Sequence, residues 1–225
     1  MEYIKHLIES YELKVNDIVV SISIYSDYNE PVPIYSISIT NISETTKIIL
    51  EKIREEFVSQ GAGALEGEGL PEISDIQNEF KKSILVLVRK YFPTANKKTI
   101  DMLISYILQQ NIGLGNIEIL LKDKNLEEIV INSAKEPIWV YHRRHGWLKT
   151  NIIMPNESRI RYYSTIIGMD IGNEITMLNP LMDAHLKTGD RVNSTLTPIS
   201  SRGNTITIRK FAVKPWTITD FIKEN

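Results

Sequence analysis

The sequence contains no cysteine among its 225 residues, which excludes disulfides, thiolate nucleophiles and thiolate metal ligands. No apolar run approaches the ~18 residues that a membrane-spanning helix needs, and the first eleven residues lack the apolar core of a signal peptide. The formal net charge is −2, so no overall basic field is available to attract nucleic acid. These absences predict a cytoplasmic protein without a nucleic-acid partner.

Two kinds of catalytic motif are also missing. Neither Gly-Lys-Ser nor Gly-Lys-Thr occurs, so the sequence cannot supply the phosphate loop that many nucleotide hydrolases use. A Gly-x-Ser-x-Gly nucleophile motif is absent as well, and no two carboxylates have a convincing catalytic spacing, which argues against an unrelated hydrolase. We therefore predict no catalytic residue and no metal site in this chain.

The hydrophobic pattern predicts both helices and strands, and 42% apolar residues are enough for a real core. Near the N-terminus, Ile4, Leu7, Ile8 and Tyr11 follow helical spacing and predict a short amphipathic helix. That helix is expected either to pack on its own domain or to dock on a partner helix. The expected strands are 18–24, 34–40, 126–132, 138–141, 191–197 and 205–210. The other expected helices begin near residues 43, 75, 96, 156 and 215.

Glycine-rich residues 61–69 predict a flexible linker between two parts of the chain. The fold class we expect is α/β of the α+β type, in which a mainly antiparallel sheet carries a polar, arginine-bearing hairpin. The expected parts are a partner-docking α/β unit at 1–60, a linker and helical connector at 61–110, an α/β domain at 111–213 and a linker at 214–225.

The segment from Asp183 to Phe211 carries the strongest functional signal. Its two expected strands alternate apolar and polar residues, and three guanidiniums lie on the polar side or in the connection: Arg191, Arg202 and Arg209. Because guanidinium presents a planar fork of donors that matches phosphate oxygens, this clustering indicates an anion site. The alternative is an ordinary solvated sheet face, on which scattered arginines are common.

A second basic segment, His142 to His145, is predicted to form a turn before Trp147. Its two histidines and two arginines could contact an acidic partner or a nucleotide, or could simply be a solvated hairpin turn. As a metal site the pair His142 and His145 is weak, because no carboxylate of matching geometry is near in the sequence.

A set of short segments resembles a known family when the segments are taken in order. They are YILQQNIGLGNIEILLKD at 106–123, NLEEIV at 125–130, VYHRRHGWLKTN at 140–151, NPLMDA at 179–184, GDRVN at 189–193 and SRGNTITIRKF at 201–211. The sequence is similar here to the secretion-superfamily ATPases of type II secretion, type IV pili and the archaeal flagellum, above all to the archaeal branch. The similarity extends over most of residues 106 to 222 and, more loosely, over residues 1 to 60.

The resemblance implies a homo-hexameric protein-transport motor that a polytopic membrane protein of the secretion or pilus platform holds at the cytoplasmic face of the membrane. Each subunit would join an N-terminal part to its own C-terminal RecA-like ATPase domain, with ATP and Mg²⁺ between them. This chain resembles the N-terminal part, since the family's phosphate loop, Asp box, Walker B acid and His box have no counterpart in it. Alone, it is expected to hold no cofactor and to be inactive.

In this family the N-terminal domain directs arginines to the nucleotide phosphates, and the matching positions here are Arg191, Arg202 and Arg209. The sequence departs from the family at Lys187 and Thr188, where Pro-Asp usually precedes the motif glycine. Two functions follow from the resemblance. The chain contributes phosphate-contacting arginines and couples domain closure to a membrane partner, or it is an interaction and oligomerisation module that docks on a membrane complex without touching nucleotide.

Overall fold

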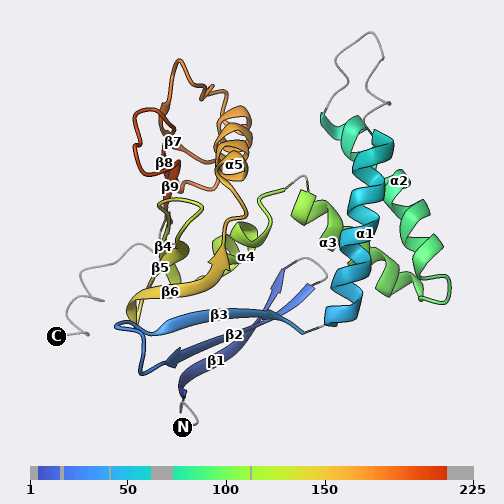
Figure 1. Cartoon of the computed structure of the whole chain (residues 1–225), viewed down its shortest axis with the longest axis horizontal. Coiled ribbons are helices and arrows are strands. Elements are labelled where there is room, and N and C mark those ends of the chain that lie inside the picture. The colour runs from blue at the N-terminus through green and yellow to red at the C-terminus, as the bar shows by residue number, and fades with distance from the viewer. Residues whose placement is uncertain (1–4, 16–17, 41, 62–72, 112, 212–225) are drawn as a thin grey trace. The chain divides into compact units, whose positions relative to one another are not determined.

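The computed structural model describes residues 5–15, 18–40, 42–61, 73–111 and 113–211 (Figure 1). The strands are β1 (His6–Val15), β2 (Ile18–Ser26), β3 (Ile34–Ile39), β4 (Leu126–Ile131), β5 (Pro137–His142), β6 (Gly146–Ile153), β7 (Leu181–His185), β8 (Arg191–Thr195) and β9 (Thr205–Arg209). The helices are α1 (Glu44–Gly61), α2 (Ile73–Tyr91), α3 (Lys97–Asn111), α4 (Asn116–Lys122) and α5 (Glu157–Asp170).

The chain divides into two compact units. The sheet unit comprises residues 1–9, 23–36 and 123–225, and the helical unit comprises residues 10–22 and 37–122. The four-part division predicted from the sequence stays a prediction, because most of its glycine-rich linker lies outside the described residues. The helix expected from residue 215 also lies outside them.

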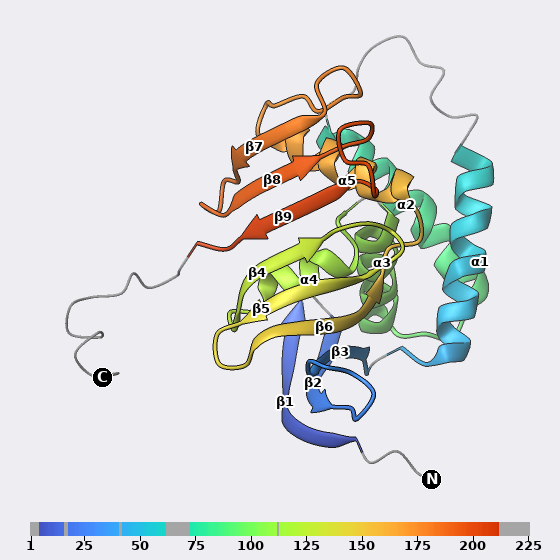
Figure 2. The ribbon, with the colours of Figure 1, turned by 60° about the vertical axis from the view of Figure 1, so that its left-hand side comes forward.

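The nine strands form one sheet in the order β1-β2-β3-β6-β5-β4-β9-β8-β7. Strand β3 runs parallel to β6, whereas the ladders that join β6, β5, β4, β9, β8 and β7 are all antiparallel. In Figure 2, β7, β8 and β9 form one side of this antiparallel part and β4, β5 and β6 the other. The predicted α+β fold with a mainly antiparallel sheet is confirmed.

In the helical unit, α1, α2 and α3 pack against one another around a common apolar core (Figure 1). The core residues with exposed fractions below 2% are Ile53, Ile84, Val88 and Leu103. Asn96 caps α3 as the sequence predicted, because its Oδ1 accepts a hydrogen bond from the backbone N–H of Thr99 at 2.9 Å. None of the helices within the described ranges is long and apolar enough to cross a membrane.

The prediction of an amphipathic helix near the N-terminus is wrong, because residues 6–15 form strand β1. Glu9, Tyr11, Leu13 and Val15 are at least partly buried, and the residues between them are exposed, which is the period of two of a strand. Helical spacing matched the apolar residues at the start of this segment, but pairing with β2 decides its structure. Helix α4 and strands β6 and β7 were not predicted.

Helix α5 lies against the hairpin of β8 and β9 in the sheet unit (Figure 1). Asn156 caps it as predicted, its side chain accepting from the backbone N–H of Arg159. The hydroxyls of Ser164 on α5 and Ser194 on β8 lie 2.7 Å apart in the buried layer between helix and sheet. This hydrogen bond satisfies both polar groups where water is excluded and fixes the hairpin's position on the helix.

Candidate functional site

The hairpin of β8 and β9 separates its apolar and basic residues as the sequence predicted. Val192, Leu196, Ile206 and Ile208 are completely buried. The arginines at 191, 202 and 209 are exposed and take no part in that core. Because buried apolar residues anchor the hairpin, the three arginines are not needed to fill its core.

Two of the three arginines lie next to each other. Arg191 on β8 is directly opposite Arg209 on β9 in the antiparallel register. On the other side of Arg191, Asp183 of β7 accepts two hydrogen bonds from it, at 3.0 Å from Nε and 2.7 Å from Nη2. This bidentate contact lowers the pKa of the Asp183 carboxyl, mainly through the hydrogen bond from Arg191. Arg191 is therefore already paired with an anion of its own chain.

The third arginine lies at the other end of the hairpin. Arg202 follows Thr195 in the connection between β8 and β9, whereas Arg191 and Arg209 pair at the opposite end. Four residue steps along a strand separate the two ends by about 13 Å. The backbone thus presents the three predicted arginines in two places, a pair and a single residue.

Arg202 lines an open pocket of about 820 Å³ in the sheet unit. One wall is the turn between β4 and β5, and the other is the connection between β8 and β9. The polar residues that line it include Ser133, Lys135, Glu136, Ser200, Ser201 and Arg202. Two cationic side chains and several hydroxyls therefore face one cavity, with a single carboxylate at its edge.

Glu157, the first residue of α5, joins the two walls of this pocket. Its Oε1 accepts from the backbone N–H of Ala134 at 2.7 Å, and its Oε2 accepts from that of Asn204 at 2.6 Å. The Asn204 side chain donates back to the Glu157 carbonyl at 2.9 Å and accepts from the backbone N–H of Thr197 at 2.8 Å. One carboxylate thus holds both loops in register with each other.

Gly203 occupies the narrowest point between the loops. Its φ is +142°, and a Cβ added there would meet Glu157 Oε1 at 2.6 Å and the Cβ of Ser133 at 2.8 Å. Only glycine combines this backbone conformation with so close an approach. The loop that carries Arg202 therefore depends on the residue that follows it.

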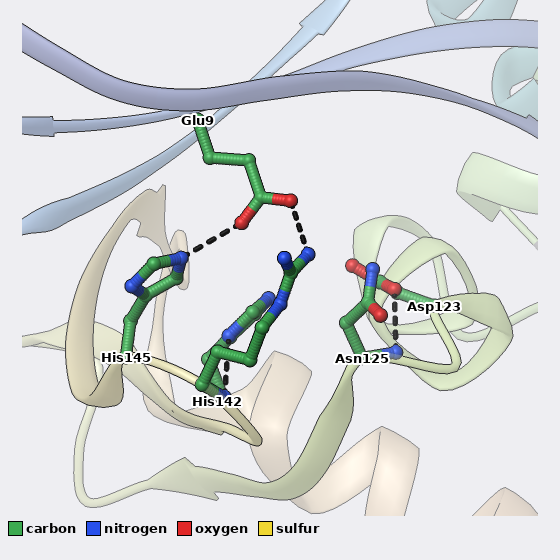
Figure 3. Close-up of polar contacts among 6 residues, drawn as sticks. Glu9, Asp123, Asn125, His142 and His145 are labelled. Carbon is green, nitrogen blue, oxygen red and sulfur yellow. Dashed lines mark hydrogen bonds and ion pairs between the residues drawn. The ribbon is translucent and has the colours of Figure 1, made fainter.

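The charged side chains of the basic turn between β5 and β6 contact other residues of the same chain (Figure 3). Arg144 and His145 both contact the carboxylate of Glu9 on β1, and Arg143 Nε donates to Glu127 at 3.1 Å. Among the described residues, no group of three or more metal-ligating side chains gathers here or elsewhere. The structure therefore accounts for the predicted basic segment by internal ion pairs.

His142 is the buried member of this turn. Its side chain is completely buried, and its ring stacks on that of His145 with centroids 4.8 Å apart. Nδ1 accepts from the backbone N–H of Arg144 at 3.2 Å, and Nε2 has no hydrogen-bond partner within the described part of the chain. Burial lowers the pKa of His142, and the neighbouring His145 lowers it further.

Sequence reasoning missed Lys135, Glu157 and Glu9. Lys135 lies in a turn whose sequence, Ser133 to Pro137, indicates only a connection between strands. Glu157 follows a helix cap, where acidic residues are common for the helix dipole alone, so nothing in the sequence predicts its two loop contacts. Glu9 lies more than a hundred residues before its partners, and no local pattern connects them.

Comparison with known proteins finds related chains of unknown function. No family model matches the sequence. Three uncharacterised proteins of Methanocaldococcus jannaschii are 28%, 34% and 36% identical over 216, 103 and 119 residues, which are 96%, 46% and 52% of this chain. The aligned regions make up 28%, 41% and 21% of those proteins, so the chain spans less than half of each relative.

Among solved structures, the fold is similar to that of the VirB11 ATPase of the Brucella suis type IV secretion system, crystallised with sulphate. The match covers 51% of this chain and 34% of that one, with 18% sequence identity and a TM-score of 0.41.

Proposed function

We propose that this chain is the non-catalytic N-terminal part of a secretion-superfamily ATPase, and that it contacts nucleotide phosphates through its arginine-bearing hairpin. The observation that carries the proposal is the placement of Arg202 and Arg209. Both are exposed on an anchored hairpin, at positions that match the family's phosphate-contacting arginines, and neither forms an ion pair with another described residue. An exposed guanidinium without a carboxylate partner is available to an incoming phosphate.

In this proposal, ATP and Mg²⁺ bind to a RecA-like domain that is not part of the chain, and the hairpin closes on the phosphates from the other side. Arginines stabilise the negative charge that spreads over the phosphoryl oxygens in the transition state. The chain's own contribution is to hold these donors on a rigid scaffold, since Val192, Ile206 and Ile208 fix the hairpin from its buried face.

The proposed setting is a homo-hexamer at the cytoplasmic face of a membrane, docked on a polytopic protein of a secretion, pilus or archaeal-flagellum platform. Closure around ATP would move the sheet unit and transmit force to that partner. For Arg191 alone, one contact favours the alternative in which the hairpin does not touch nucleotide. Its bidentate pair with Asp183 makes Arg191 a contact between β8 and β7 in this structure.

ATP turnover tests the proposal in the longer protein that contains this chain and an ATPase domain. Replacing Arg202 or Arg209 with Ala should lower turnover by about ten- to a thousandfold while the melting temperature stays within a few degrees. Lysine should restore turnover only in part, because an ammonium keeps the charge but loses the fork of donors. Near-normal turnover in both Ala variants would contradict the phosphate role.

A further inference from the structure

The pocket beside Arg202 contains a second cation, Lys135, that no sequence motif singles out. Lys135 lies in the turn between β4 and β5 and faces the same cavity as Arg202 from the opposite wall. Neither side chain forms a hydrogen bond or ion pair with any other described residue. Two unneutralised cations that line one cavity raise the local concentration of anions there, although the whole chain has a net charge of −2.

The remaining lining is that of an oxyanion site. Ser133, Thr195, Ser200, Ser201 and Thr205 border the cavity, and their hydroxyls can donate hydrogen bonds to phosphate oxygens. Glu136 is the one carboxylate among the lining residues. The other carboxylate at these loops, Glu157, is already bonded to the backbone N–H groups of Ala134 and Asn204.

The walls of the pocket are held in place before any ligand arrives. Glu157 bonds the backbone on both sides, at Ala134 next to Lys135 and at Asn204 two residues after Arg202. The Ser133 hydroxyl also accepts from the backbone N–H of Lys135 at 3.2 Å and shapes the turn. Because both loops are bonded to the same carboxylate, the fold sets the separation of the backbones that carry Lys135 and Arg202.

From this arrangement we infer that Lys135 and Arg202 together bind a phosphate-type oxyanion in this pocket, and that Lys135 is a ligand-contacting residue. The ligand class is a polyphosphate, either free or as the phosphate chain of a nucleotide. The inference deepens the proposed function and rests on it for the role of Arg202, but it assigns a site on the chain itself. Without an amide cradle or a metal ion, the affinity should be weak, with dissociation constants in the millimolar range.

Amide NMR of the 15N-labelled 225-residue chain tests the inference at low ionic strength, where exposed charges are least screened. Tripolyphosphate should shift the amide signals of residues 133–136 and 200–204. Lys135→Ala should weaken its binding by about tenfold, the scale of one charge-assisted hydrogen bond. Lys124→Ala is the matched control: it removes the same charge from an exposed lysine of the same unit, and it should leave the affinity within about twofold.

Two further experiments identify which phosphate compound is bound and test whether positive charge in the pocket favours binding. If the pocket recognises the phosphate chain, ATP should bind about as well as tripolyphosphate and adenosine should not bind. A clear preference for tripolyphosphate over ATP would indicate that the ligand is free polyphosphate. Glu136→Gln should strengthen binding, because it removes the one carboxylate at the rim. Equal affinities for the Lys135→Ala and Lys124→Ala variants, or signal shifts only outside the two loops, would overturn the inference.

The outcomes separate this inference from the proposed function. If the pocket binds no polyphosphate but Arg209→Ala still lowers ATP turnover in the longer protein, the pocket assignment fails and the proposed function stands. If the pocket binds polyphosphate through Lys135 and the arginine variants keep normal turnover, the anion site stands and the motor role fails.

Discussion

Glu9 Oε2 lies 2.7 Å from Nε2 of His145, so a side-chain hydrogen bond joins the first strand of the sheet to the turn between β5 and β6 (Figure 3). Arg144 contacts the other oxygen of the same carboxylate. The hydrogen bond from His145, aided by the charge of Arg144, lowers the pKa of Glu9. Next to this pair, His142 is buried and stacked on His145.

These groups predict that acid destabilises the sheet unit in two steps. His142 has a lowered pKa in the folded state, so the unfolded chain takes up a proton first as the pH falls below about 6.5, and the free energy of unfolding decreases from there down to the lowered pKa. Glu9 also has a lowered pKa; its contribution is present above about pH 4.5 and is lost as the pH falls through the folded-state pKa. Denaturant unfolding monitored by tryptophan fluorescence, with Trp139 and Trp147 in this unit, measures both steps.

The His142→Asn variant should flatten the upper step, which begins at about pH 6.5, because Asn keeps an acceptor for the Arg144 N–H and does not titrate. The groups around His142 that also shape this step are His145, Asp123, Glu9 and Arg144. An unaltered slope in His142→Asn would show that other groups carry the acid dependence.

Glu157→Gln should destabilise the sheet unit by about 1–3 kcal/mol, because one of the two loop N–H groups loses its acceptor and faces an amide NH₂ instead. The affected groups are the backbone N–H of Ala134 and that of Asn204. Urea unfolding measures the change, with Glu174→Gln, at an exposed loop position, as the control that removes the same charge. A loss no larger than that of the control would mean that the loops do not depend on this carboxylate.

Gly203→Ala should cost more than Gly146→Ala, although both glycines have positive φ. At Gly146, with φ +67°, an added Cβ meets nothing within 4 Å, so only the backbone strain of about 1–2 kcal/mol applies. At Gly203, with φ +142°, the Cβ would also collide with Glu157 and Ser133. Thermal unfolding of the two variants compares them directly, and equal melting temperatures would argue against the tight approach of the two pocket loops.

Arg191→Ala should lower ATP turnover of the longer protein less than Arg209→Ala does. The two residues are cross-strand neighbours, but only Arg191 is engaged by Asp183 through two hydrogen bonds. A guanidinium that already has a carboxylate partner gains less from a phosphate, since it must first give up that partner. Steady-state kinetics of both variants, with Asp183→Asn to release Arg191, measures the ranking. The reverse order would show that the Asp183 contact breaks when nucleotide binds.

The sequence by itself determined several local elements of the protein and the buried residues of its arginine-bearing hairpin. Alternating apolar residues predicted β8 and β9, and the buried set of Val192, Leu196, Ile206 and Ile208 is the one expected. Asn96 and Asn156 cap helices where predicted, because capping depends on bonds over only three residues. The fold class follows from these same short-range periods.

Only the tertiary structure decided which charges meet. The pairing of β7 with β8 brings Arg191 next to Asp183, and the register of β8 and β9 separates Arg202 from the other two arginines. Lys135 and Arg202 come to one pocket because Glu157 bonds two loops that are about 70 residues apart in the chain. Strand β1 replaced the predicted helix because it pairs with the adjacent strand β2, and this pairing outweighs the helical spacing of a few apolar residues.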